Sequence, residues 1–131
     1  MQATWEKRAL QIAVAIGACV PVAGGASGVL HGLAFVGVAN GGGADSHFRY
    51  LSGLLLAIGA GYWSCLPDIE NQGERFRVLT AIVLAGGIAR GVGALHADGH
   101  SFSVLAPLAM EVLVAPALLV WREAFARRAS L

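Results

Sequence analysis

Charged residues are scarce in this chain. Asp, Glu, Lys and Arg together make up only 13% of its 131 residues, whereas 56% of the residues are hydrophobic and 18 are glycine. An aqueous surface of ordinary charge density cannot be built from this composition, which excludes an ordinary soluble domain. The mean hydropathy of +0.67 indicates an integral membrane protein instead.

Excess basic charge and familiar chemical motifs are also missing. Nine Lys and Arg residues nearly balance eight Asp and Glu residues, so the net charge of +1 leaves no basic field for a nucleic acid. Cys19 and Cys65 are far apart and form no CxxC pair, so no disulfide framework or thiol redox motif is indicated. There is no GxSxG, HExxH or phosphate-binding glycine loop. We expect no cofactor, and an enzyme would have to use charges buried in the membrane.

Long stretches without charge place the membrane spans. A helix needs about 20 apolar residues to cross a bilayer. The uncharged runs predict an all-α fold, an integral membrane four-helix bundle that takes up residues 1–131 as a single transmembrane domain. The predicted spans are Ala9–Val29, Phe48–Leu66, Arg77–Leu95 and Phe102–Trp121. Residues 30–47 are rich in glycine and predict an outer loop or a shallow re-entrant segment.

The basic residues that flank these spans predict the orientation of the bundle. Seven of them lie at the two ends of the chain or between the second and third spans: Lys7, Arg8, Arg75, Arg77, Arg122, Arg127 and Arg128. The other two connections hold only Arg49. The positive-inside rule therefore predicts that both termini are cytoplasmic, and Trp5, Trp63 and Trp121 fall at the same side. Although Lys7 and Arg8 before an apolar run resemble a signal peptide, we expect the first span to be retained.

Small residues repeat every four positions along three of the spans and predict close helix contacts. The repeats are Gly24, Gly28 and Gly32; Gly53, Ala57 and Gly61; and Gly87 with Gly91. Packing within one chain explains them better than a dedicated dimer motif, because Ala and Gly are abundant throughout. Pro21, Pro107 and Pro116 lie inside spans, where each removes an N–H and is expected to bend its helix and free a carbonyl.

Three ionisable residues fall inside or at the edge of the spans, where a charge is costly: Arg49, Arg90 and Glu111. Arg90 lies about 20 Å along the third span, and Glu111 lies about 13 Å along the fourth, which runs the other way. Their depths are similar, and side chains lean toward the N-terminus of their own helix, so the two side chains converge. We therefore predict an ion pair between Arg90 and Glu111.

Arg49 begins the second span and shares a small, slightly polar face with Ser52. Because Arg49 leans outward, lipid phosphate or water is its easier partner, and Glu111 is a second one through a shared network. Arg49, Ser52, Arg90 and Glu111 form the predicted polar site. Two interpretations stand equal: a neutralised pair that fixes helix register, or a ligand or proton site that opens to the outer face.

The string from His96 to His100 is the candidate for a metal site. His96, Asp98 and His100 could together hold Zn or Cu. Gly99 between the two imidazoles favours a flexible turn over a helix that would fix both rings on one face. We therefore expect a solvated loop and no metal at these residues.

Several motifs resemble a known family. They are His47-Phe48-Arg49-Tyr50-Leu51-Ser52-Gly53, Leu66-Pro67-Asp68-Ile69-Glu70, Gly86-Gly87-Ile88-Ala89-Arg90 and Met110-Glu111-Val112. Together they resemble small four-span bacterial membrane proteins of unknown function in the broad DoxX-like group, over Ala9–Trp121. The resemblance implies a four-helix bundle in which Arg49, Arg90 and Glu111 are the recurring polar set. It implies no activity.

Three functional hypotheses follow for a multi-pass protein of the bacterial cytoplasmic membrane. The first is a non-catalytic accessory subunit, or a binder of a small amphiphile or anion at the buried Arg and Glu site. The second is an oligomeric proton-linked transporter that uses Glu111. The third is a membrane-embedded isomerase-like enzyme with Glu111 as acid or base. Expected partners are the lipid bilayer and another membrane subunit or a second copy, and no nucleic acid.

Overall fold

A computed structural model describes residues 2–39, 41–96 and 101–130. Every regular element in these residues is helical: α1 (Gln2–His31), η1 (Gly32–Val36), α2 (Gly42–Cys65), η2 (Leu66–Asp68), α3 (Gly73–Leu95), α4 (Phe102–Ala109), η3 (Met110–Val114) and α5 (Ala115–Ala129). η1 and η2 are short 3₁₀ helices, and η3 is a π-helical turn that joins α4 to α5. Four helical segments of the described chain are long and apolar enough to cross a membrane.

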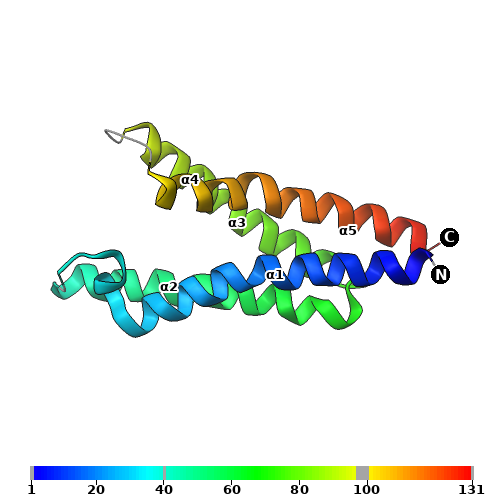
Figure 1. The fold of residues 1–131 in the computed structure, drawn as a ribbon, viewed down its shortest axis with the longest axis horizontal. Helices are drawn as coiled ribbons and strands as arrows, with labels where there is room; N and C mark the ends of the chain where they lie inside the picture. Colours follow the sequence, from blue (N-terminus) through cyan, green and yellow to red (C-terminus); the bar gives the residue numbers. More distant parts are fainter. Residues whose placement is uncertain (1, 40, 97–100, 131) are drawn as a thin grey trace.

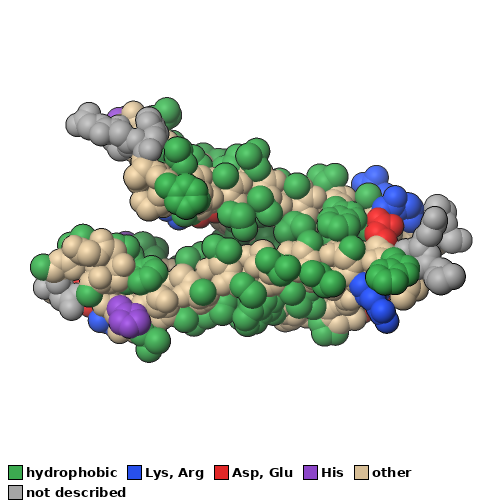
Figure 2. Space-filling view, viewed as in Figure 1, with side chains coloured by type: hydrophobic (Ala, Val, Ile, Leu, Met, Phe, Trp, Pro, Cys, Tyr) green, Lys and Arg blue, Asp and Glu red, His purple; other side chains and the backbone are tan. Residues whose placement is uncertain are grey.

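The helices form two arms that meet at one end of the molecule and diverge at the other (Figure 1). One arm is the antiparallel pair of α1 and α2, and the other contains α3, α4, η3 and α5. Both chain ends lie where the arms meet, which we call the termini end. At the opposite end, which we call the open end, the space-filling surface is hollowed between the arms (Figure 2).

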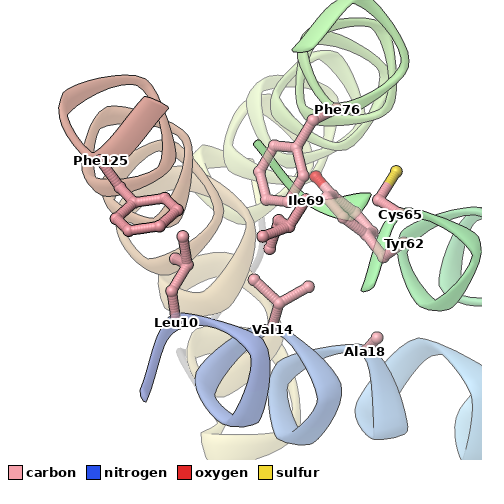
Figure 3. Close-up of a cluster of buried hydrophobic side chains, with 8 residues drawn as sticks. All are labelled: Leu10, Val14, Ala18, Tyr62, Cys65, Ile69, Phe76 and Phe125. Carbon is pink, nitrogen blue, oxygen red and sulfur yellow. The ribbon is translucent and has the colours of Figure 1, made fainter. Parts of the chain in front are cut away.

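The buried side chains explain why the arms are held together at one end only. A core cluster at the termini end joins all four long segments (Figure 3): Leu10, Val14, Ala18, Tyr62, Cys65, Ile69, Phe76 and Phe125. The rings of Tyr62 and Phe76 meet edge to face with their centroids 5.0 Å apart. By contrast, no residue of α4 is buried. The predicted all-helical fold with four apolar helices is correct, but the helices form a splayed arrangement and not a uniformly packed bundle.

The arm of α1 and α2 packs closely because glycines remove side chains from its interface. A Cβ placed on Gly25 would lie 2.5 Å from the Leu56 backbone nitrogen, and one on Gly28 would overlap the Ser52 side chain. Gly59 similarly faces Val22 and the Ala18 carbonyl. Of the predicted repeats, Gly28 makes such a contact between α1 and α2, and Gly61 and Gly87 make close contacts with Leu79 and Glu111. Gly25 and Gly59 are close-contact positions outside the predicted repeats.

The glycine-rich connection is shorter than the loop predicted for residues 30–47. α1 continues to His31, η1 follows it, and α2 already begins at Gly42. Gly32 and Gly37 have positive φ angles of 59° and 76°, which allow the sharp turn after α1. The expectation of an irregular segment up to residue 47 was wrong for residues 42–47, because this part of the chain continues the second span as helix.

Candidate functional site

A cavity of about 290 Å³ lies between the two arms. Its walls come from α1, α2, α3, α4, η3 and α5, and they are almost entirely apolar: Val14, Gly17, Ala18, Val20, Pro21, Gly24, Leu55, Ile58, Tyr62, Ile82, Val83, Gly86, Arg90, Pro107, Met110, Glu111, Val114, Ala115 and Leu118. This volume is near the lower end of the ~300–1,000 Å³ found for small-molecule sites. Tyr62, Arg90 and Glu111 are the titratable residues in this lining.

Arg90 and Glu111 form a two-pronged ion pair in the wall of the cavity. Arg90 Nε donates to Glu111 Oε2 and Arg90 Nη2 donates to Glu111 Oε1, both at 2.9 Å. The predicted pairing of these two side chains is therefore present. The two partners are not equally accessible: 39% of the Arg90 side chain is exposed against 16% for Glu111. The guanidinium is thus the partner that presents free N–H groups to a visiting molecule.

The glycine pair of α3 makes room for this ion pair. A Cβ on Gly87 would lie 2.8 Å from the Glu111 Cβ and 3.0 Å from a Val112 methyl carbon. A side chain at residue 87 would therefore push Glu111 away from α3, and glycine at this position lets the Glu111 side chain reach Arg90. The neighbouring residue, Gly86, lines the cavity instead, and a Cβ placed on it would meet no atom within 4 Å.

The polar and apolar parts of the cavity lie at different depths. On α3, Ile82 and Val83 come before Arg90, and on the last segment Leu118 comes after Glu111, so both charges lie on the open-end side. Toward the termini end the remaining polar group is the Tyr62 hydroxyl, which is 2.8 Å from Thr80 Oγ1. Thr80 in turn donates to the Phe76 carbonyl. Because this hydroxyl is already partnered, the floor of the cavity is effectively apolar.

Glu111 lies in the π-helical turn η3. The Ala115 N–H donates to the Met110 carbonyl, five residues earlier, and Pro116 has no N–H to donate. The predicted disturbance by proline is therefore present in the last span, as a widened turn between Pro107 and Pro116, whereas α1 continues as an α-helix through Pro21. Single π-helical turns inside α-helices are frequent at functional sites.

Arg49 and Ser52 lie outside this site. Arg49 Nε donates to Asp45 Oδ2 at 2.8 Å, and its Nη1 atom donates to the carbonyls of Val29 and Leu30 at the end of α1. Asp45 also accepts the Leu33 N–H. Ser52 is buried and donates to the Phe48 carbonyl. Arg49 therefore joins α1 to α2 near the open end, and the predicted network linking it to Glu111 was wrong for the described residues.

The candidate metal residues fall mostly outside the described part of the chain. Asp98 and His100 are among the residues that the structure does not describe. The His96 ring lies 2.8 Å from the Val92 carbonyl at the end of α3. Within residues 2–39, 41–96 and 101–130, no three His, Cys, Asp or Glu side chains are grouped as metal ligands.

Arg122 has a role that the sequence analysis missed, since it counted this residue only as a basic charge. Its side chain is buried, with 4% exposed, and its guanidinium donates to the carbonyls of Ile69 and Glu70 in the connection between α2 and α3. It also pairs with Glu123, which accepts two hydrogen bonds from Arg77. These contacts fix the connection against α5 and lock the termini end.

A further ion pair ties α1 to the same connection. Lys7 Nζ lies 2.6 Å from Glu70 Oε1, and this hydrogen bond holds the pKa of the Glu70 carboxyl below its ordinary value. A lowered pKa means that the pair stabilises the folded state above the unfolded pKa of Glu70, and this contribution is lost as the pH falls through the lowered value. Polar contacts thus reinforce the closed end of the molecule.

The fold and the site define a class of protein: a multi-pass helical membrane protein with one Arg–Glu pair in an apolar cavity. The chain belongs to the family described as domain of unknown function DUF4345, whose model matches residues 9–122. No curated protein and no solved structure matches the chain significantly. The matched residues cover the second and third apolar segments, most of the first and last ones, and Arg90, Glu111 and Arg122.

Proposed function

We propose that this protein binds a small amphiphile in the cavity between its two arms, without acting on it chemically. The head group lies beside Arg90 and the apolar tail extends toward Tyr62 and Leu118. The observation that carries this proposal is the division of the cavity into a charged side, at the open end, and an apolar floor. A molecule with one polar end and one apolar end is complementary to such a cavity.

The charged pair supports a binding role because a purely structural bridge does not need a cavity. Arg90 uses its Nε and Nη2 atoms for Glu111, which leaves other N–H groups of its five for an acceptor on a ligand. Keeping a charge within a membrane costs about 2.5–3.5 kcal/mol on insertion scales. A role in recognition explains why the pair lies beside an apolar cavity and was not replaced by apolar side chains.

The proposal includes an orientation and a location. The termini end faces the cytoplasm and the open end faces outward, in the cytoplasmic membrane of a bacterium. The seven-to-one distribution of flanking basic residues supports this orientation. The motifs around Arg49, Arg90 and Glu111 support the bacterial source through their resemblance to the DoxX-like group. The ligand then reaches Arg90 from the outer leaflet or the outer aqueous phase.

Reporter fusions test this orientation. A phosphatase reporter active only outside the cytoplasm is expected to be inactive when fused after Leu131 and active when inserted at Gly99. A fluorescent reporter that matures only in the cytoplasm serves as the control and should show the reverse pattern. The same compartment for both positions would contradict a single membrane span between Gly99 and the end of the chain.

Filling the cavity tests the binding role directly. The Gly86→Leu substitution adds a side chain to open space in the wall, so it is expected to exclude part of the ligand tail without straining the fold. Losing the burial of two methylene groups, at about 0.8 kcal/mol each, weakens binding by about tenfold. The probe is octanesulfonate, and its binding to the protein in lipid nanodiscs is measured by calorimetry after subtraction of empty nanodiscs.

Gly93→Leu is the matched control for this experiment. Gly93 is on the same helix and a Cβ there also meets no atom within 4 Å, but Gly93 is not part of the cavity lining. Octanesulfonate is expected to bind this variant as it binds the unchanged protein. Equal binding by both leucine variants would place the ligand elsewhere, and the absence of saturable binding by the unchanged protein would refute the proposed function.

A proton-linked transporter is the second candidate, and the position of Glu111 in a π-helical turn between two prolines favours it. Such a turn can change its hydrogen-bond register, and a carboxylate within it can carry a proton. Flux of octanesulfonate across proteoliposomes, driven by a pH gradient, separates this function from binding alone. Binding without flux supports the simpler proposal.

A further inference from the structure

We infer that the ligand of the cavity is an anionic single-chain amphiphile, and that Glu111 takes up a proton when this ligand binds. The inference rests on the proposed function and adds the charge of the head group and its coupling to pH. It follows from the geometry of the Arg90–Glu111 pair and from the charges that the cavity lining contains.

The guanidinium is the accessible partner, which decides the sign of the head group. With 39% of its side chain exposed against 16% for Glu111, Arg90 offers N–H donors to the cavity while both Glu111 oxygens already accept from it. A cationic head group would have to reach past Arg90 to the less accessible carboxylate. An oxygen-bearing anion such as a carboxylate, sulfonate or phosphate matches the exposed donors and the fork geometry of arginine.

Charge balance then requires a change at Glu111. The free cavity holds one cation and one anion, and the lining from α1 and α2 adds only the Tyr62 hydroxyl, which is bonded to Thr80. A second anion would leave an excess negative charge among apolar walls, which is costly, and two anions beside one another favour protonation of one of them. Arg49, the cation of α2, is engaged by Asp45 and is not part of this lining.

The exchange balances in both charge and hydrogen bonds. The ionised head group accepts from the Arg90 N–H groups that Glu111 does not use, and a proton from the solvent binds the Glu111 carboxylate, whose other oxygen still accepts from Arg90. The neutral Glu111 carboxyl then has an O–H group that can donate to a second oxygen of the head group. Arg90 remains a cation throughout, so the cavity contains one cation and one anion before and after binding.

Proton uptake during binding tests this inference. Octanesulfonate stays ionised at all working pH values, so any proton that enters the complex belongs to the protein. Calorimetric titrations of the protein in nanodiscs, at one neutral pH but in two buffers with different ionisation enthalpies, give the number of protons taken up. We expect about one proton per bound octanesulfonate, and an affinity that falls about tenfold for each unit of rising pH.

Two comparisons make the result specific to the head group and to Glu111. The Glu111→Gln variant keeps a side chain of the same shape and is expected to bind octanesulfonate with about zero proton uptake and no pH dependence. Octanol, which has the same tail without a charge, is expected to bind more weakly than octanesulfonate to the unchanged protein and without proton uptake.

The possible failures separate this inference from the proposed function. Saturable binding of octanesulfonate that Gly86→Leu weakens, but without proton uptake by the unchanged protein, would overturn the inference and leave the binding role intact. Tighter binding of octanol than of octanesulfonate would overturn the anionic head group in the same way. If neither probe binds saturably, the proposed function fails as well. None of these measurements on the unchanged protein depends on the stability of a variant.

Discussion

Replacing Arg90 with methionine while Glu111 is retained is expected to lower the free energy of unfolding by about 3 kcal/mol. The variant leaves the Glu111 carboxylate without its cation in an apolar cavity, where only 16% of this side chain is exposed. Either the charge remains buried or Glu111 is protonated, and each alternative weakens the folded state. Glu111→Leu alone is expected to have a similar effect, because it leaves the Arg90 cation unpaired.

The double variant, Arg90→Met with Glu111→Leu, is expected to recover much of this loss. Apolar side chains of similar size replace an ion pair in apolar surroundings at little cost, so the effects of the single changes do not add. Thermal and denaturant unfolding of the protein in detergent gives the coupling free energy. Additive losses, with a coupling below about 0.5 kcal/mol, would contradict the contact between the two side chains.

The pair of Arg77 and Glu123 is the control for this cycle. It has the same two-pronged geometry, with distances of 3.0 and 2.7 Å, but 56% of the Arg77 side chain is exposed at the termini end. An exposed pair contributes about 1 kcal/mol or less, so its cycle should give a smaller coupling.

The folded double variant of the cavity pair also separates a structural role of the pair from a binding role. If the pair is a binding site, this variant is expected to fold but no longer to bind octanesulfonate.

The central charged pair was predictable because depth and direction along a helix follow from residue number. The position of Arg90 late in one span and of Glu111 midway along the next, antiparallel span places them at one level. The partner of Arg49 was missed for a related reason. Asp45 lies four residues before Arg49, and the two share a helix face because α2 already begins at Gly42. The run of glycines at this position favoured a loop, so the sequence did not predict this pairing.

The divergence of the two arms and the cavity between them did not follow from the sequence. When nearly every position in a span is apolar, periodicity no longer distinguishes a core face from a lipid face. The structure identifies the core face by a few residues near the termini end, such as Leu10, Phe76 and Phe125. The prolines indicated a disturbed fourth span, but not whether it would be a kink or the π-helical turn that contains Glu111.

Replacing Arg122 with methionine is expected to destabilise the protein by about 3–5 kcal/mol, as much as or more than any change in the cavity. Methionine fills a similar volume but donates no hydrogen bonds, so the carbonyls of Ile69 and Glu70 lose the guanidinium that they share. Hydrogen bonds to a charged group contribute about 1.5–3 kcal/mol each when buried. Gly73 also packs against the guanidinium, since a Cβ there would lie 2.6 Å from Arg122 Nη1.

Arg127→Met removes the same charge from an exposed position on the same helix and is expected to change the free energy of unfolding by no more than about 0.5 kcal/mol. Arg122→Lys keeps the charge but lacks the fork that reaches two carbonyls, so its stability should be intermediate. Equal unfolding midpoints for Arg122→Met and Arg127→Met would contradict a stabilising role for the hydrogen bonds of Arg122 to Ile69 and Glu70. Arg122 is not part of the cavity lining, but its hydrogen bonds hold the connection between the two arms. The loss of these hydrogen bonds should therefore also weaken octanesulfonate binding.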